Sequence, residues 1–192
     1  MAGNGFRTSG FVKLIAGSFF LALVAFPLLA GTAAAEEPPA FLLWFGSFGS
    51  DDGQLDAPAG AAVDSAGNVY VADQYNHRIQ KFDGGGNFLT KWGAEGSGDG
   101  EFYYPAGVAV DSAGNVYVAD FSNHRIQKFD VDGNFLAKWG SRGSGDGLFN
   151  SPAGVAVDSA GNVYVADYYN HRIQKFGGGG NLLAKWGSRG SG

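Results

Sequence analysis

An internal repeat of 47 residues organises most of this 192-residue sequence. Pro58, Pro105 and Pro152 each begin nearly the same string, and the middle copy reads PAGVAVDSAGNVYVADFSNHRIQKFDVDGNFLAKWG. Copies this similar imply one structural unit used three times, and a period of this length is typical of solenoids and propellers. The fold therefore has to arise from the stacking of three equivalent units.

Each copy predicts four short strands separated by tight turns. In the middle copy the strands are expected at residues 107–110, 115–119, 125–129 and 134–139, which include many β-branched and aromatic residues. The connecting segments contain the Asp, Asn and Gly residues that tight turns require. The inner strands have apolar or small residues at successive positions, which point to opposite faces of a sheet, so both faces should be covered. This pattern predicts an all-β fold, a β-propeller of four-stranded antiparallel blades. Three complete blades are expected at about 58–93, 105–140 and 152–187.

The strings DSAGNVYVAD and NHRIQKF, followed by a later F-L-x-K-W-G, resemble the NHL repeat, which is named for its Asn-His-Leu residues. Asn76-His77, Asn123-His124 and Asn170-His171 match the first two letters of that name. The resemblance covers residues 41–192. It implies a β-propeller, commonly six-bladed, that serves mostly as an interaction module, although a few members of the family are lyases.

Residues 41–46 resemble the outer strand of a blade, but no inner strands of the repeat precede them. In closed propellers an N-terminal outer strand often completes the last blade, so an orphan outer strand is expected here. After Trp186 the sequence begins another linker. We therefore expect the N-terminal portion of a longer, six-bladed propeller. The alternative is a dimer in which two chains join as three plus three blades in a two-fold ring.

Residues 1–35 have the pattern of a signal peptide. Arg7 and Lys13 give a basic start, an apolar run follows from Leu14 to Ala30, and small residues end at Ala35. Cleavage is expected after Ala35, which leaves a short linker at 36–40 and no stable membrane span. An uncleaved anchor is the alternative, although the apolar run is near the lower limit for crossing a bilayer. The expected location is secreted or periplasmic.

Composition narrows the class further. The 33 glycines accompany 45% hydrophobic residues, so they indicate many turns in a packed protein rather than disorder. The absence of cysteine excludes disulfides, thiolate metal sites and a cysteine nucleophile. A net charge of −5 disfavours a general affinity for nucleic acid. No cofactor is expected.

Residues that recur at one phase in every copy are expected to build the blade. These structural positions are Asp73, His77, Arg78, Asp120, His124, Arg125, Asp167, His171 and Arg172. The three histidines could suggest a metal site, but each begins the third strand from the axis and should lie far from the others, so no metal is expected. Each Asp–Arg pair is expected to fix a hairpin, with recognition of an anionic ligand as the alternative.

Repeated aromatic residues are expected to fill space. Trp92, Trp139 and Trp186 end the outer strands and should pack between blades, with sugar stacking as the alternative. Phe102 and Phe149, with Leu55 at the same phase, are assigned to packing. The segment from Asp130 to Asn134 resembles the start of a calcium loop, but it lacks the acidic twelfth position and is interpreted as an ordinary turn.

Residues that differ between copies are the candidates for binding. Two kinds of loop, those between the second and third strands and those just before the innermost strand, should emerge on one rim of the blades. The rim positions are Tyr75, Tyr103, Tyr104, Phe121, Tyr168 and Tyr169. Exposed aromatic residues on variable loops over a rigid scaffold are typical of a binding face. The alternative is that several of these rings pack between neighbouring blades.

These observations favour a non-catalytic extracytoplasmic scaffold that binds a protein, peptide or glycan through the rim loops. The alternative is a fragment of an NHL-type propeller enzyme, a metal-dependent lyase or hydrolase-like protein, whose active-site residues lie in blades outside this sequence. No unrepeated cluster of titratable residues is evident, so no catalytic residue is assigned. RNA binding would require a basic rim, and the charge has the opposite sign.

Overall fold

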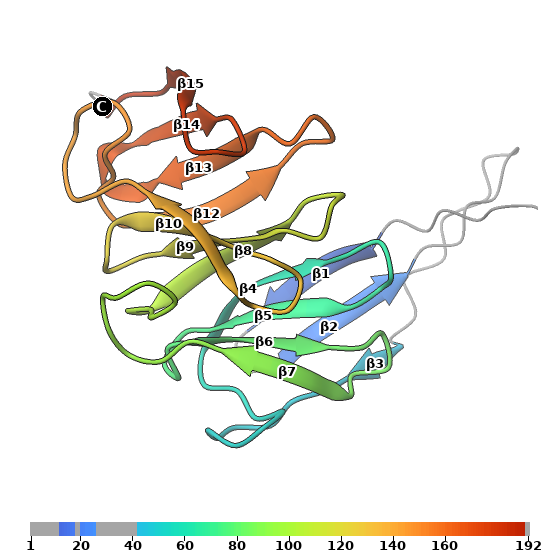
Figure 1. Ribbon diagram of the computed structural model, residues 1–192. Coiled ribbons are helices and arrows are strands. Elements are labelled where there is room, and N and C mark those ends of the chain that lie inside the picture. Colours follow the sequence, from blue (N-terminus) through green and yellow to red (C-terminus); the bar gives the residue numbers. More distant parts are fainter. Residues whose placement is uncertain (1–11, 18–19, 26–41, 191–192) are drawn as a thin grey trace, which may run out of the picture. The chain divides into compact units, whose positions relative to one another are not determined.

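The computed structural model describes residues 12–17, 20–25 and 42–190, and the chain divides into two compact units, Met1–Phe45 and Gly46–Gly192. The larger unit consists of three four-stranded antiparallel sheets that follow one another along the chain (Figure 1). In every sheet the strands are paired in sequence order, as in a meander. The predicted all-β fold with four-stranded antiparallel blades is therefore confirmed.

The three sheets are called blades 1, 2 and 3. Blade 1 contains β4 (Pro58–Val63), β5 (Val69–Asp73), β6 (Arg78–Phe82) and β7 (Phe88–Trp92). Blade 2 contains β8 (Pro105–Val110), β9 (Val116–Asp120), β10 (Arg125–Phe129) and β11 (Phe135–Trp139). Blade 3 contains β12 (Pro152–Val157), β13 (Val163–Asp167), β14 (Arg172–Phe176) and β15 (Leu182–Trp186), with the 3-10 turn η1 (Tyr168–Asn170) between β13 and β14.

The turn between the first two strands of each blade shows why Asp, Gly and Asn recur there. In blade 2, Asp111 Oδ1 accepts hydrogen bonds from the backbone N–H groups of Ala113 and Asn115, both at 2.9 Å. Gly114 has φ = 85°, a left-handed conformation that glycine adopts without strain. The carboxylate of Asp111 thus accepts hydrogen bonds from backbone N–H groups that a short turn would leave unpaired. As a result, the next strand starts in a fixed register.

The second strand of each blade lies at the centre of the packing. All five residues of β5 and all five of β9 are buried. The outer strands alternate in exposure, because only one of their faces is covered. Trp92 and Trp139 reach from these outer strands to the next blade, where their rings lie 5.9 Å from Phe129 and 6.0 Å from Phe176. The expected packing of these tryptophans between blades is confirmed.

The inner strands β4, β8 and β12 lie side by side, and glycine permits their close approach. A Cβ built on Gly60 would lie 2.6 Å from the carbonyl oxygen of Ala106 in β8. A Cβ on Gly107 would lie 2.9 Å from the carbonyl oxygen of Ala153 in β12. Backbone atoms cannot move aside as a flexible side chain can, so only glycine fits where one inner strand meets the next. The repeated Pro-Ala-Gly therefore marks the contact between blades.

The smaller unit contains a sheet of β1 (Val12–Gly17), β2 (Phe20–Ala25) and β3 (Leu43–Trp44), in that order. The segment expected to be an orphan outer strand at 41–46 contains β3, which is two residues long, belongs to none of the three blades and is paired with β2. An unpaired strand edge leaves backbone donors and acceptors unsatisfied, and β2 supplies hydrogen-bonding partners for those of β3. The proposed cleavage site at Ala35 and the linker at 36–40 lie outside the described residues.

Candidate binding surface

A buried carboxylate organises the turn between the second and third strands of every blade. Asp73 is fully buried, and its Oδ2 accepts hydrogen bonds from Arg78 Nε at 2.7 Å and from Gln80 Nε2 at 2.9 Å. Its Oδ1 accepts the backbone N–H of Asp56 at 2.7 Å, and Asn76 Nδ2 donates to both oxygens. The charge is therefore paired and its lone pairs are satisfied, as burial requires.

The arginine of this group also holds the linker that leads into the same blade. Arg78 Nη1 donates to the carbonyl oxygen of Ser50, and Nη2 donates to those of Asp51 and Gln54, at 2.7–2.9 Å. Blades 2 and 3 repeat the arrangement. The corresponding groups are Asp120, Asn123, Arg125 and Gln127, and then Asp167, Asn170, Arg172 and Gln174. With its guanidinium engaged by protein atoms, the arginine tethers a loop that has no regular secondary structure.

The repeated histidine connects one blade to the next. His77 and His124 adopt left-handed backbone conformations, with φ of 54° and 56°. His77 Nδ1 accepts the backbone N–H of Tyr104 at 3.2 Å, and His124 Nδ1 accepts that of Ser151 at 2.9 Å. Burial, and secondarily the positive charge of Arg142, lower the pKa of His124. The neutral imidazole that results is the form that can accept this hydrogen bond.

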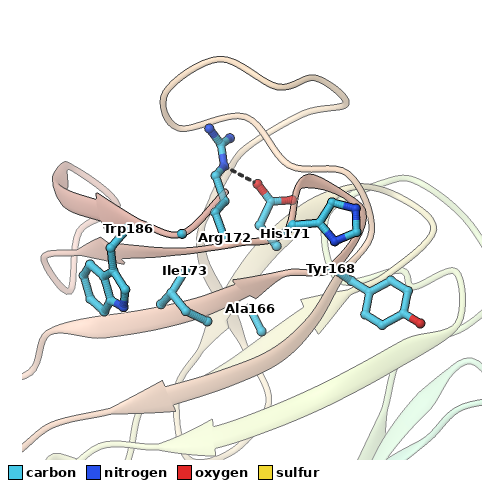
Figure 2. Close-up of a pocket in the computed structure, with 8 residues that line it drawn as sticks. Ala166, Tyr168, His171, Arg172, Ile173 and Trp186 are labelled. Carbon is cyan, nitrogen blue, oxygen red and sulfur yellow. Dashed lines mark hydrogen bonds and ion pairs between the residues drawn. The ribbon is translucent and has the colours of Figure 1, made fainter. Parts of the chain in front are cut away.

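His171, the third of the set, lines a surface depression of about 300 Å³ on blade 3 (Figure 2). Among the described residues, no group of three or more histidine, aspartate or glutamate side chains could hold a metal ion. At the sequence that resembles a calcium loop, Asp130 Oδ1 accepts the backbone N–H groups of Asp132 and Asn134. The carboxylate thus closes the turn on itself.

The loops that carry the variable aromatic residues are hydrogen-bonded to one another. Tyr75 N donates to the carbonyl oxygen of Asp56, and Ser122 N donates to that of Tyr103. Tyr169 in blade 3 has the equivalent bond. Each bond joins the turn between the second and third strands to the linker just before the innermost strand. Both kinds of variable loop therefore lie on the same rim.

Contacts between rings extend this rim across blades 1 and 2. Tyr103 stacks on His77, with ring centroids 5.5 Å apart and an interplanar angle of 14°. Tyr104 lies 4.7 Å from Tyr103 and 5.6 Å from Tyr75. Tyr75, Tyr104 and Phe121 line a shallow depression of about 230 Å³. The aromatic residues of the first two blades thus form one cluster around a small hollow.

The cluster continues into blade 3. The ring of Phe121 lies 6.5 Å from that of Tyr169, which is 4.8 Å from Tyr168. Four of the rings are exposed to solvent: Tyr75, Tyr103, Tyr168 and Tyr169 are 40–59% exposed. Tyr104 and Phe121 are half-buried between them. We call the six aromatic residues together the aromatic rim. It offers ring faces for stacking and phenolic hydroxyls for hydrogen bonding, which are the groups that binding interfaces favour.

Two features of this region were not evident from the sequence. One is the capture of linker carbonyl groups by the repeated arginines, and the other is the bond from histidine to the following blade. The linker is rich in glycine and has no periodic pattern that could reveal its path. A weak signal existed, since each linker has the same length and the same distance to the next proline.

Solved structures share this fold. A gluconolactonase from Xanthomonas campestris superposes with a TM-score of 0.59 at 15% identity, and the match covers 90% of this chain and 59% of that one. A structure of a nidogen/laminin complex superposes with a TM-score of 0.57 at 21% identity, and the match covers 88% of this chain and 62% of that one. Virginiamycin B lyase from Staphylococcus aureus superposes with a TM-score of 0.56 at 11% identity, and the match covers 88% of this chain and 49% of that one. At these identities the likeness concerns the fold alone, and it places the chain in the β-propeller class.

The sequence model of the NHL repeat matches residues 55–82, 102–129 and 149–176. The chain therefore contains three NHL repeats, as its sequence resemblance predicted. Protein lin-41 of Caenorhabditis elegans is 52% identical over 50 residues, which are 26% of this chain and 4% of that protein. Protein brain tumor of Drosophila melanogaster is 50% identical over 44 residues, which are 23% of this chain and 4% of that protein. The matches thus span only a small part of these relatives.

None of the helices within the described ranges has the length and apolar character needed to cross a bilayer.

Proposed function

We propose that this protein is a non-catalytic, extracytoplasmic interaction module whose aromatic rim binds a protein partner. The observation that carries the proposal is the continuous run of aromatic rings at positions that differ between otherwise near-identical blades. The Asp–Arg groups, His77 and His124 are engaged in holding the scaffold, whereas four rings project into solvent, those of Tyr75, Tyr103, Tyr168 and Tyr169. A rigid frame beneath variable exposed aromatic residues reduces the entropy lost on binding.

An extracytoplasmic location is supported by the basic start, apolar run and small residues of positions 1–35. The experiment is to express the whole chain in its source cell and to determine the N-terminus of the protein recovered from each compartment. The proposal expects a mature protein that begins at Glu36 in the medium or periplasm. Recovery of the intact chain from the cytosol alone would overturn it.

The rim is tested by changing Tyr75, Tyr103, Tyr168 and Tyr169 together to serine. A matched control changes three exposed apolar residues on the outer strands, Leu89, Leu136 and Leu183, which are 48–50% exposed. Each form is immobilised and used to capture proteins from the extracytoplasmic fraction of the source cell, with circular dichroism to verify the β structure. Capture should be lost with the serine variant and kept with the leucine control.

Two outcomes would contradict the proposal. One is a serine variant that captures the same proteins as the unmodified chain. The other is capture that survives protease treatment of the fraction but not glycosidase treatment, which would identify a glycan as the ligand instead. The enzyme alternative rests on likeness of fold, since two of the structures that superpose are named as a lactonase and a lyase. Fold alone does not determine function.

A further inference from the structure

The hollow in the aromatic rim lies between blades 1 and 2 and is lined by rings from both sides. Tyr75 follows β5 in blade 1, Phe121 follows β9 in blade 2, and Tyr104 ends the linker between the two blades. The rings of Tyr75 and Tyr104 are 5.6 Å apart and inclined by 73°, so they form two walls of a corner. Gln74 and Ser122 also line the hollow. Its volume of about 230 Å³ is below the roughly 300–1,000 Å³ of pockets for drug-sized ligands, and it suits a single side chain.

The scaffold fixes the ring of Tyr104 in the hollow. The backbone of this residue is left-handed, with φ = 56°, and its N–H donates to His77 Nδ1 at 3.2 Å. Its ring lies 4.6 Å from the imidazole of His77 and 4.7 Å from the ring of Tyr103. A ring that is already held in place loses little conformational freedom when a ligand stacks on it. The hollow is therefore formed before any ligand binds.

The linkers that border the hollow carry negative charge. The backbone carbonyl of Asp56 accepts the N–H of Tyr75, so Asp56 adjoins the hollow. Glu95 and Glu101 belong to the linker that ends at Tyr104. Within the described ranges, the carboxylates of Asp56, Glu95 and Glu101 form no ion pair. The faces of aromatic rings attract cations, and unpaired carboxylates nearby strengthen that attraction.

The junction between blades 2 and 3 lacks these two tyrosines and both glutamates, although its frame is nearly identical. Forty-seven residues further along the chain, the positions of Tyr75, Tyr104, Glu95 and Glu101 are occupied by Ser122, Ser151, Arg142 and Leu148. Burial, and then the positive charge of Arg142, lower the pKa of His124, so this linker position acts on the imidazole between the two blades. Glu95 places a negative charge at the same position of the first junction. The two tyrosine walls and the carboxylates thus occur together at the first junction and not at the second.

We propose that this hollow binds an arginine side chain in a basic segment of the protein partner. This inference rests on the proposed function and names the chemistry that the rim recognises. A guanidinium is planar and stacks on aromatic faces, and its N–H groups donate hydrogen bonds in the plane of the stack. The side chains of Gln74 and Ser122 supply acceptors at the hollow, and the neighbouring carboxylates favour the positive charge.

Titration of the 15N-labelled full chain with a blocked Gly-Ser-Arg-Ser-Gly peptide, followed by NMR, tests this proposal. The backbone amide signals of Gln74 and Ser122 should shift as the peptide is added. A peptide with citrulline, a neutral side chain of the same shape, should bind at least about fivefold more weakly, because the attraction of the cation to the rings is lost. A lysine peptide should also bind more weakly, since an ammonium group has no plane to stack. Equal binding of the citrulline peptide, or equal binding of the lysine peptide, would overturn the assignment to arginine.

The second junction supplies substitutions that the frame already tolerates. Tyr75→Ser and Tyr104→Ser reproduce the residues found there, and each should weaken binding of the arginine peptide at least about fivefold. Glu95→Arg reproduces Arg142 and should weaken it through charge alone. Phe48→Ser is the matched control, because it removes a ring that is 79% exposed and does not line the hollow, and it should leave binding unchanged. Circular dichroism should show that every variant keeps its β structure.

This inference and the proposed function fail in different ways. An arginine peptide that shifts neither amide signal, or tyrosine variants that bind it as the unmodified chain does, would overturn the inference. If the unmodified chain still captures partner proteins in that case, the proposed function stands. Binding of the arginine peptide without capture of any protein would support the arginine site and contradict the proposed function.

Discussion

Replacing Phe149 with alanine tests how strongly this side chain of the linker joins blades 2 and 3. The ring is fully buried and lies 5.6 Å from the ring of Phe176. An aromatic side chain removes about 200 Å² from water, which at about 25 cal/mol per Å² is worth about 5 kcal/mol. Alanine retains part of this burial, so the expected loss in the free energy of unfolding is about 4 kcal/mol, in line with other phenylalanine truncations.

The assay is urea-induced unfolding followed by tryptophan fluorescence, because Trp139 packs at the same junction. Phe48→Ala is the control, since this phenylalanine is 79% exposed, and it should change the free energy of unfolding by less than about 0.5 kcal/mol. A loss below about 1.5 kcal/mol for Phe149→Ala would refute the ring of Phe149 as the main contact between blades 2 and 3.

Two further predictions concern charge. Asp120→Ala removes the carboxylate that pairs with the buried guanidinium of Arg125, so the free energy of unfolding should fall by about 3–5 kcal/mol in the same assay. The control is Asp99→Ala, which breaks an exposed pair with Lys138 and should lower the free energy of unfolding by less than about 1 kcal/mol. The lowered pKa of His124 favours the neutral form in the folded state, so its contribution to stability is complete above the ordinary pKa of 6.5 and declines as the pH falls below it. His124→Gln should weaken this dependence between pH 7.5 and 5; an unchanged dependence would contradict it.

Much of the fold could be predicted from the repeat. The third strand of blade 2 was expected at residues 125–129, and β10 has these bounds. The first strand was expected at 107–110, but β8 starts at Pro105. Proline has no N–H to donate to a neighbouring strand, so its presence argues against a strand at that position. The structure accommodates Pro105 because the strand register shifts between Pro105 and Gly107. A bulge of this kind depends on the partner strand, so local composition did not indicate it.

The candidate site was predictable in its members but not in its contacts. Alternation and turn residues placed Tyr75 and Tyr103 on loops of the same rim. The stacking of Tyr103 on His77 joins residues from two different blades, and it depends on the angle between the sheets. A single sequence does not specify that angle. The unexpected pairing of β3 with β2 has a similar origin, because which segment meets an open strand edge is decided by the assembled backbone.

The central claim is that the blades stack through their inner strands, and one comparison tests it most directly. Gly107 and Gly154 occupy the same position of the repeat, but only on Gly107 would a Cβ point at another described inner strand. A Cβ on Gly107 would lie 2.9–3.1 Å from backbone atoms of β12, whereas a Cβ on Gly154 would meet only the Cβ of Ala166, at 3.5 Å.

The measurement is the free energy of unfolding of Gly107→Ala and Gly154→Ala, at a concentration where the chains are monomeric. Stacked blades predict that Gly107→Ala loses about 1–3 kcal/mol, because the backbone of the next strand has to shift. Gly154→Ala should be neutral or slightly stabilising, because alanine restricts the unfolded chain. Equal effects of the two changes would show that the inner strands do not meet, and would contradict the account.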